Sequence, residues 1–498
     1  MPENEVLELH PTGWESDPAD EYFKLSTLDY CSLQVYNNYA LFFKLPDAVK
    51  PKTVPVLKRG LEITISQCRQ LCGVLEAHPE GGLCFHKKRE STVQFHVQWL
   101  DGPEAEDRYP SFDDLEKRHF VSQALGDLNT WCVAPMTYGD KPEAQPASKP
   151  RAAAFKASFI RGGLVLMMHH LHYANDVMGW AGELHQLAEN CAAVWKSWDN
   201  PVLPGWDTAC LDYSRFTKSD VPEDQQVDGP PVPPSRHIDQ KPGGQWLLFH
   251  LPKSKIAELK EAASPAAGAG YWISSYDAYT AFIWRMVVKH KAELFNPDPK
   301  EVLVWAEAID MRRRFHDPPV PRRTQGNVLN LAFNMPESPA PPLTVEDVIS
   351  EVPLSRVAWY IRQMTNSSTE ETFDALLSSI APVRDKTTLY LRMDSFHPMT
   401  NFATDWRDTE PCEADFGFAK PHAFRHPFDT VSSGLAIVYP VRTNSPPAGD
   451  DEGHEFIIGL EKEVARHLVD DPEWNRYFEF RGVDSEEKVY VDGLTAAV

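Results

Sequence analysis

The pattern of apolar and polar positions predicts a β-hairpin that leads into a long helix between residues 154 and 198. Residues 154–160 and 164–170 are mostly apolar, and the turn Arg161-Gly162-Gly163 separates them. From Val177 onward, apolar side chains recur at 177, 180, 181, 184, 187, 188, 191, 194, 195 and 198. This spacing is typical of a helix that buries one broad stripe. A strand-to-helix connection is therefore expected at residues 171–176.

Strands and helices are predicted along the whole chain. In the first half, residues 91–100 alternate as a strand does, and residues 54–77 have a helix-like pattern. In the second half, the pattern predicts helices at 253–262 and 276–294, the latter capped by Ser274 or Ser275. Strands are expected at 246–251, 301–309, 434–441 and 456–460. The predicted fold class is therefore α/β, or α+β, with sizeable mixed sheets.

Length and a proline-rich break together predict two domains. A chain of 498 residues is too long for one hydrophobic core. Residues 218–245 hold six prolines and few apolar residues, which is typical of a solvated connector. We therefore expect an N-terminal domain at 1–217, an acidic proline-rich linker at 218–245 and a C-terminal domain at 246–498.

Charge and cysteine usage narrow the function classes. The formal net charge of -23 disfavours nucleic acid and anionic membranes as partners. Met1-Pro2-Glu3-Asn4 opens a polar stretch without the apolar segment of a secretory signal. No apolar run approaches the ~18 residues that span a bilayer. The eight cysteines are scattered, so we expect reduced thiols and a cytoplasmic protein.

His172 is the first candidate for chemistry, because it follows the predicted strand at 164–170 and precedes the helix. A histidine held on a rigid element near a core is suited to remove a proton. Asp176, four residues later, can orient the imidazole, pair with an arginine or cap the helix, and spacing does not decide among these. A second copy, His467-x-x-x-Asp471, lies in a charged helix and is interpreted as structural.

A histidine cluster raises the question of a metal. The residues concerned are His169, His170, His172, Asp176 and His185. Strand alternation places His170 and His172 on one face, and zinc needs further ligands from elsewhere. Because no His-Glu-x-x-His or Cys-x-x-Cys is present, we expect no metal, and a metal-dependent hydrolase is the weakest alternative.

A second distinctive stretch is Asp415-Phe-Gly-Phe-Ala-Lys-Pro421. A glycine between two aromatic residues predicts a tight bend where the backbone approaches another part of the protein. Taken alone, this stretch is more typical of a hairpin or loop corner than of a functional element.

Together, His172-x-x-x-Asp176 and the stretch at 415–421 resemble the BAHD acyl-CoA-dependent acyltransferases, and the fungal members most of all. Further matches follow in the family's order: Leu25-Ser-Thr-Leu-Asp29, the helix from Ser275 to Trp284-Arg285, Ala308-Ile-Asp310-Met-Arg312, Gly326-Asn327 and Thr404-Asp-Trp406. The chain departs from the family at Phe418 and Ala419, where Trp and Gly are usual, and at Val177, where a glycine usually follows the aspartate.

The resemblance implies two chloramphenicol-acetyltransferase-like domains with the active site in a channel between them. His172 is then the general base for direct attack on the thioester of an acyl-CoA, with acetyl-CoA as the expected co-substrate. Thr404 and Trp406 are the candidates for stabilising the oxyanion. No covalent acyl-enzyme is required, in agreement with the absence of a Gly-x-Ser-x-Gly motif.

The remaining site residues also follow from the resemblance. Asp176 pairs with Arg312 and keeps the turn rigid, while Asp415 and Gly417 are structural. The phosphates of CoA need positive charge. The candidates for binding them are Lys253, Lys255, Lys260 and Ser275, with Arg322 and Arg323 as a second option.

The expected activity is acyl transfer to a hydroxyl of a small secondary metabolite by a monomer that binds no nucleic acid or membrane. Three alternatives stay open on the same fold: N-acylation, condensation of a carrier-bound acyl group, and a binding protein on an inactive scaffold. The His-His-x-x-x-Asp-Gly of condensation domains is absent, because Leu171 precedes His172 and Val177 follows Asp176.

Overall fold

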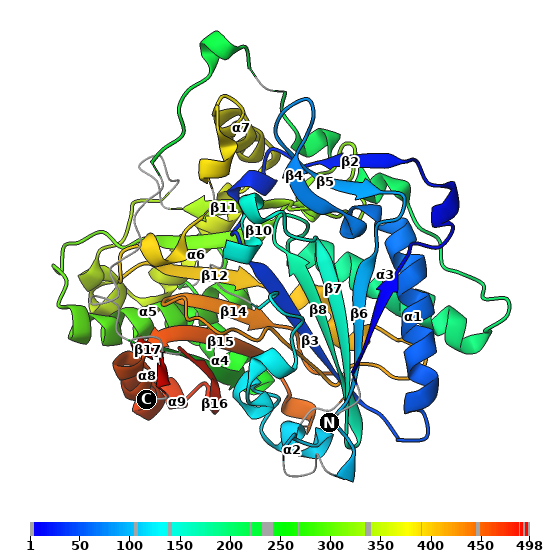
Figure 1. Ribbon diagram of the computed structural model, residues 1–498. Helices are drawn as coiled ribbons and strands as arrows, with labels where there is room; N and C mark the ends of the chain where they lie inside the picture. The colour runs from blue at the N-terminus through cyan, green and yellow to red at the C-terminus, as the bar shows by residue number, and fades with distance from the viewer. Residues whose placement is uncertain are drawn as a thin grey trace.

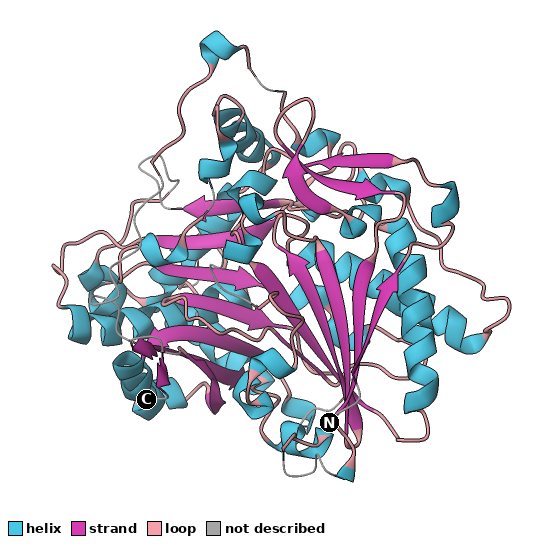
Figure 2. Ribbon diagram, viewed as in Figure 1, coloured by secondary structure: helices cyan, strands magenta, loops and turns pink. Residues whose placement is uncertain are grey.

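The computed structural model describes most of the chain. The described residues are 4–103, 108–137, 142–219, 221–231, 243–266, 268–333, 340–389, 391–444, 449–487, 489–491 and 494–496. Two large mixed sheets stand side by side, with helices packed against each of them (Figures 1 and 2). The expected α/β class with mixed sheets is therefore confirmed.

The first large sheet has six strands in the order β1-β6-β7-β8-β3-β13. Its strands are β1 (Asn4–Leu9), β3 (Tyr36–Lys44), β6 (Val93–Trp99), β7 (Ala153–Ile160), β8 (Gly163–Leu171) and β13 (Ala423–Arg425). The predicted hairpin is β7 and β8, whose register places Ile160 opposite Gly163. Every residue of β8 is buried, because β8 lies between β7 and β3 and is covered on both faces, and this explains its unbroken apolar run.

The second large sheet has seven strands in the order β11-β10-β12-β14-β15-β9-β16. They are β9 (Gly244–Leu251), β10 (Trp305–Asp310), β11 (Leu329–Phe333), β12 (Asn401–Asp405), β14 (Leu435–Tyr439), β15 (His454–Glu461) and β16 (Glu479–Glu486). The strands β10, β12 and β14 are parallel and their neighbours antiparallel. All seven come from the second half of the chain, which also supplies β13 to the first sheet.

Helices cover both sheets. Figure 1 shows α1 (Lys50–Gln67) and α3 (Val177–Lys196) side by side against the six-stranded sheet. They pack so closely that a Cβ on Gly60 would lie 2.2 Å from Cys191 Sγ. The helices α4 (Lys253–Ala263), α5 (Ser275–Phe295), α6 (Leu354–Ser367) and α8 (Lys462–Asp470) pack on the seven-stranded sheet. The shorter helices are α2 (Phe112–Lys117), α7 (Glu370–Ile380) and α9 (Pro472–Asn475).

The predicted helix at 54–77 is wrong at both ends. The helix α1 begins four residues earlier and stops at Gln67, and residues 74–77 form strand β4 (Val74–Ala77) instead. This strand pairs with β5 (Leu83–Lys88) in a small sheet whose third strand is β2 (Asp20–Lys24). A Cβ on Gly73 would lie 2.8 Å from Phe85 Cβ. Tertiary pairing with β5 therefore decides the conformation of this segment, and local periodicity does not.

Several other elements agree with the sequence. The helices α4 and α5 begin and end within one residue of the predicted ranges. Ser274 caps α5 and accepts a hydrogen bond from the Asp277 amide, whose side chain in turn accepts one from the Ser274 amide. The strand expected at 301–309 begins only at Trp305. A two-stranded sheet of β17 (Val489–Val491) and β18 (Leu494–Ala496) lies near the end of the chain.

Candidate active site

A cavity of about 160 Å³ lies between the two large sheets. The first half of the chain contributes β3, the turn after β8 and the start of α3 to its wall. The second half contributes β10, β11, β12, β14 and the segment after β13. Its lining includes the polar or hydrogen-bonding side chains of Asn37, His172, Asp176, Asn327, Thr404, Trp406 and His426. Most of the other lining residues are apolar.

The backbone of the turn that carries His172 is held by hydrogen bonds to both halves of the chain. The His172 amide donates to the Val35 carbonyl at 2.9 Å. The His172 carbonyl accepts a hydrogen bond from Asn327 Nδ2 at 2.9 Å. Both peptide groups of this residue are therefore fixed, and the imidazole projects into the cavity from a rigid connection.

The imidazole of His172 is kept in its neutral form. Burial lowers its pKa below the ordinary histidine value, and its own carbonyl, Asp176 and Asn327 oppose this effect only in part. The Nδ1 atom is fully buried, so Nε2 is the nitrogen that can reach an acceptor in the cavity. A neutral imidazole with one accessible nitrogen can take up a proton near neutral pH.

Asp176 makes the ion pair with Arg312 that the resemblance implies. Its two oxygens lie 2.9 and 3.0 Å from Nη2 and Nη1 of the guanidinium. The same carboxylate accepts the amide of Gly179 at 2.8 Å and that of Val328 at 2.9 Å. Of the three roles that spacing left open, the geometry shows arginine pairing and helix capping. The carboxylate is engaged by four donors, none of which is the His172 ring.

A second buried carboxylate, Asp29, supports the same turn through Asn327. Asp29 Oδ1 accepts hydrogen bonds from Asn327 Nδ2 at 2.8 Å and from the Asn327 amide at 3.1 Å. Burial raises the pKa of Asp29 to about 6, although these hydrogen bonds oppose the rise. Asp29 and Asn327, which belong to two separate motifs of the sequence, are thus in contact, and Asn327 also contacts the backbone of His172.

Thr404 and Trp406 line the same cavity from the end of β12. Trp406 Nε1 donates a hydrogen bond to Thr404 Oγ1 at 3.0 Å. Since this oxygen already accepts from the indole, the hydroxyl proton of Thr404 is left to donate to another group. Both residues line the cavity that His172 also lines.

Comparisons with known proteins show the family of the chain. Residues 226–474 match the Transferase family, and residues 35–191 match the trichothecene 3-O-acetyltransferase-like N-terminal domain. The chain is 54% identical to an acetyltransferase of Gibberella zeae, FGR3, across 97% of this chain and 95% of that protein. It is 24% identical to trichothecene 3-O-acetyltransferase TRI101 of Fusarium sporotrichioides, with 90% of this chain and 95% of that one covered.

A solved structure of the F. sporotrichioides TRI101, complexed with coenzyme A and T-2, superposes with a TM-score of 0.72 at 22% identity, covering 92% of this chain and 100% of that one. The chain belongs to the Transferase (BAHD) family. It is therefore an acyl-CoA-dependent O-acyltransferase with the two-domain fold of that family. Among the helices that the structure describes, none combines the length and the hydropathy needed to cross a bilayer.

The second family motif of this acyltransferase forms a bend against α3, away from the cavity. Asp415 Oδ1 accepts the Gly417 amide at 2.8 Å, and Gly417 has a φ of 82°. A Cβ at Gly417 would lie 2.8 Å from Trp195 Cβ and 2.9 Å from Ala192 Cα. Gly417 therefore lets the bend press against the helix that follows His172. Phe418 also packs edge-on to Trp195.

The four residues first considered for CoA binding, Lys253, Lys255, Lys260 and Ser275, are all described by the structure. None of them lines the cavity that contains His172. Lys253, Lys255 and Lys260 lie on α4, where Lys255 pairs with Glu258 at 2.9 Å. Ser275 is the first residue of α5.

Arg322 and Arg323, the other candidates for binding the CoA phosphates, line a separate cavity beside α3. There Arg323 is paired with Glu189, and Arg322 lies 3.4 Å from Glu410. The positive charges of this cavity are thus largely neutralised within the protein.

Sequence reasoning missed His426, a second histidine at the cavity. It follows β13, stacks on Phe428 at a centroid distance of 4.2 Å and contacts Asn37 Oδ1 through Nε2 at 3.2 Å. Burial lowers its pKa to about 3, and the neighbouring His172 contributes in the same direction. His426 is therefore neutral at physiological pH and serves as a polar group in a mostly apolar wall. No motif of the sequence signals its position.

The two histidines that precede His172 in the candidate cluster have polar partners in the core. His170 Nε2 lies 2.7 Å from Glu183 Oε2, and both side chains are fully buried. His169 contacts Asn38 Oδ1 through Nδ1 and accepts the Val133 amide at Nε2. These side chains satisfy polar groups of the core.

Proposed function

We propose that this acyltransferase moves an acetyl group from acetyl-CoA to a hydroxyl of a small, largely apolar secondary metabolite, with His172 as the general base. One observation carries the proposal: the neutral imidazole of His172 and the hydroxyl of Thr404 line one cavity between the two sheets. The relative that is 54% identical is named an acetyltransferase, which supports acetyl as the group transferred.

The proposed reaction needs only groups that line the cavity. Nε2 of His172 takes the proton of the acceptor hydroxyl while the oxygen of that hydroxyl attacks the thioester carbonyl. The oxyanion accepts a hydrogen bond from the Thr404 hydroxyl, which Trp406 Nε1 orients by donating to Oγ1. The tetrahedral intermediate then collapses, the C–S bond breaks, and the imidazolium returns its proton to the CoA thiolate. Asp176 acts indirectly by fixing the turn.

The cavity lining supports an apolar acceptor. Its apolar side chains include those of Leu28, Leu33, Leu329, Leu331, Leu391, Met393, Phe402, Phe428, Leu435 and Ile437. Asn37 and His426 add two neutral polar groups, which suit the hydroxyl or carbonyl oxygens of such a molecule. A charged acceptor would lose its hydration here without gaining an ion pair.

For CoA we keep α4 and the start of α5 as the proposed binding elements. Lys253 and Lys260 are exposed on α4, and their charge suits phosphate groups. Asp415 and Gly417 are proposed as structural residues only.

We further propose a monomer with domains at 1–217 and 246–498 joined by the segment 218–245. Most of the second half of that segment lies outside the described residues. The eight cysteines are all free thiols, which supports a reducing, cytoplasmic compartment.

Product analysis tests the proposal. The purified enzyme is incubated with acetyl-CoA and an extract of candidate metabolites, and acetylated products and free CoA are measured. We expect a product with the wild type and a loss of ~100-fold or more with His172→Ala. His78→Ala, in the turn between β4 and β5 and outside the cavity lining, is the control and should keep full activity.

Parallel reactions separate the alternatives. Longer acyl-CoAs test the acyl group, amine analogues of the acceptor test N-acylation, and a carrier-linked donor tests condensation. Turnover by His172→Ala at the wild-type rate contradicts the role of the imidazole. Binding of acetyl-CoA and acceptor without any product indicates an inactive scaffold.

A further inference from the structure

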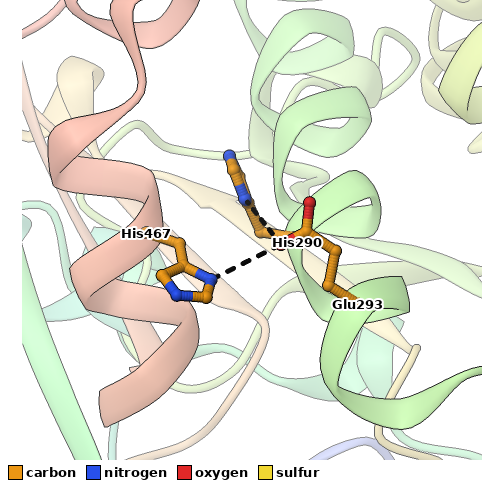
Figure 3. Close-up of side chains that lie close together, drawn as sticks. All are labelled: His290, Glu293 and His467. Carbon is orange, nitrogen blue, oxygen red and sulfur yellow. Dashed lines mark ion pairs between the residues drawn. The ribbon is translucent and has the colours of Figure 1, made fainter.

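We propose that His290, Glu293 and His467 form a Zn²⁺ site that links α5 to α8, remote from the cavity. His290 and Glu293 lie three residues apart on α5 and therefore on the same face of that helix. His467 faces them from α8 (Figure 3). One donor atom from each of the three side chains lies within 4.8 Å of the other two.

The spacing of the donors is close to that of a zinc site. Glu293 Oε2 lies 3.4 Å from His467 Nδ1 and 3.8 Å from His290 Nδ1. Tetrahedral Zn²⁺ with bonds of about 2.0–2.1 Å holds its nitrogen and oxygen donors roughly 3.4 Å apart. The side chain of Glu293 is 56% exposed, so it can make the small adjustment that closes the site.

His290 has the hydrogen-bonding arrangement of a metal ligand. Its Nε2 lies 3.0 Å from Asp471 Oδ2, and the side chain is only 7% exposed. Asp471 is itself held in place, because it accepts the amides of Glu473 and Trp474 at the start of α9. A carboxylate at Nε2 places the proton there and leaves the lone pair on Nδ1. Nδ1 is buried without a hydrogen-bond partner among the described residues and points toward Glu293.

His467 needs one change to bind zinc. Its Nε2 lies 3.0 Å from Arg466 Nη2, an arrangement in which Nε2 accepts a hydrogen bond from the guanidinium. Binding through Nδ1 moves the imidazole proton to Nε2, so the exposed Arg466 side chain turns away into solvent. The negative charges of Glu293 and Asp471 offset the positive charge of the metal.

Two imidazoles and one carboxylate favour Zn²⁺ over Mg²⁺ or Ca²⁺, which prefer sites made of oxygen donors. The side chains of Glu293 and His467 are 56% and 36% exposed, so water can take the fourth position. The helices that carry the ligands share a core that includes Val287, Ala465 and Leu468. Their backbones are therefore held together before the metal binds, as a specific site requires.

The experiment uses the full-length protein, stripped with a chelator and then titrated with Zn²⁺ alone. Bound zinc is measured by elemental analysis and affinity by competition with a chromophoric chelator. We expect one zinc per chain. His467→Ala and Glu293→Gln should weaken binding by more than ~100-fold, because each removes a ligand. Asp471→Asn should weaken it by about 10–100-fold, because it removes only the carboxylate behind His290.

His86→Ala is the matched control. Both nitrogens of His86 are engaged by carboxylates, Glu76 at 2.7 Å and Asp20 at 2.8 Å, and the residue lies in the small three-stranded sheet. This variant should keep the zinc. Thermal melting in chelator checks that the variants fold like the wild type, and added zinc should raise the melting temperature of the wild type and of His86→Ala only. Equimolar zinc retained by a His467→Ala/Glu293→Gln double variant overturns the proposal, as does a wild type that binds no zinc at micromolar concentration.

Discussion

Replacing Asp176 by Asn tests whether this carboxylate acts on the turn or on the imidazole. The substitution keeps the size of the side chain and one oxygen that can cap α3 through Gly179. It removes the negative charge that faces the guanidinium of Arg312 at 2.9 and 3.0 Å. The new amide also directs N–H groups toward Arg312 or Val328, both of which are donors.

The magnitude follows from the burial of the pair. The side chains of Asp176 and Arg312 are 6% and 2% exposed. Breaking a buried ion pair by removing one partner costs about 3–5 kcal/mol. Asp310 Oδ1 remains 2.7 Å from Arg312 Nη1, so we expect the lower end, about 3 kcal/mol. With about 2.1 cal/mol/K of unfolding entropy per residue, such a loss lowers the melting temperature of this 498-residue chain by about 3 °C.

The assay combines thermal melting with the pH profile of kcat/KM. If Asp176 acts on the turn, Asp176→Asn melts earlier, but its acid limb stays where the wild type has it. Asp310→Asn is the matched control, because its partly exposed carboxylate contacts the same arginine. An unchanged melting temperature together with a loss of about 10⁴-fold in kcat, as for the aspartate of a catalytic triad, refutes the reasoning.

Three further predictions concern the cavity and the second motif. Thr404→Val should lower kcat by about 10²–10³-fold, which is the effect of removing one oxyanion donor. Trp406→Phe should lower kcat less, because it removes only the hydrogen bond that orients Thr404. Steady-state kinetics measures both effects, and a wild-type kcat for Thr404→Val excludes Thr404 as an oxyanion donor. Burial lowers the pKa of His172, and the neutral ring is the active form in the proposed mechanism. The value of kcat/KM should therefore fall only below the ordinary histidine pKa of about 6.5, and a fall that begins above this pH contradicts the assignment. Gly417→Ala should destabilise the fold by about 2 kcal/mol or more, since φ is 82° and a Cβ would meet Trp195; an unchanged melting curve argues against this packing.

Much of the secondary structure can be predicted from the sequence, because local pattern and tertiary environment agree there. The hairpin of β7 and β8, the helix α3 and the capped start of α5 are examples. The helix predicted over residues 68–77 is wrong because the apolar side chains of this segment fit a helix and a strand equally well. Pairing of β4 with β5 decides between them, and no local signal reports a strand partner.

The candidate site divides in the same way. His172, Thr404 and Trp406 are recognisable because each belongs to a short motif, and the fold brings them to one cavity. His426 and Asn37 have no motif, and Lys253, Lys255 and Lys260 lie away from the cavity on α4. The sequence by itself predicted most of the elements and singled out His172 as the candidate base, since periodicity and short motifs are local. Only the tertiary structure decided which distant residues meet, because the contacts of Asp176 with Arg312 and of Asn327 with Asp29 and His172 join segments more than a hundred residues apart.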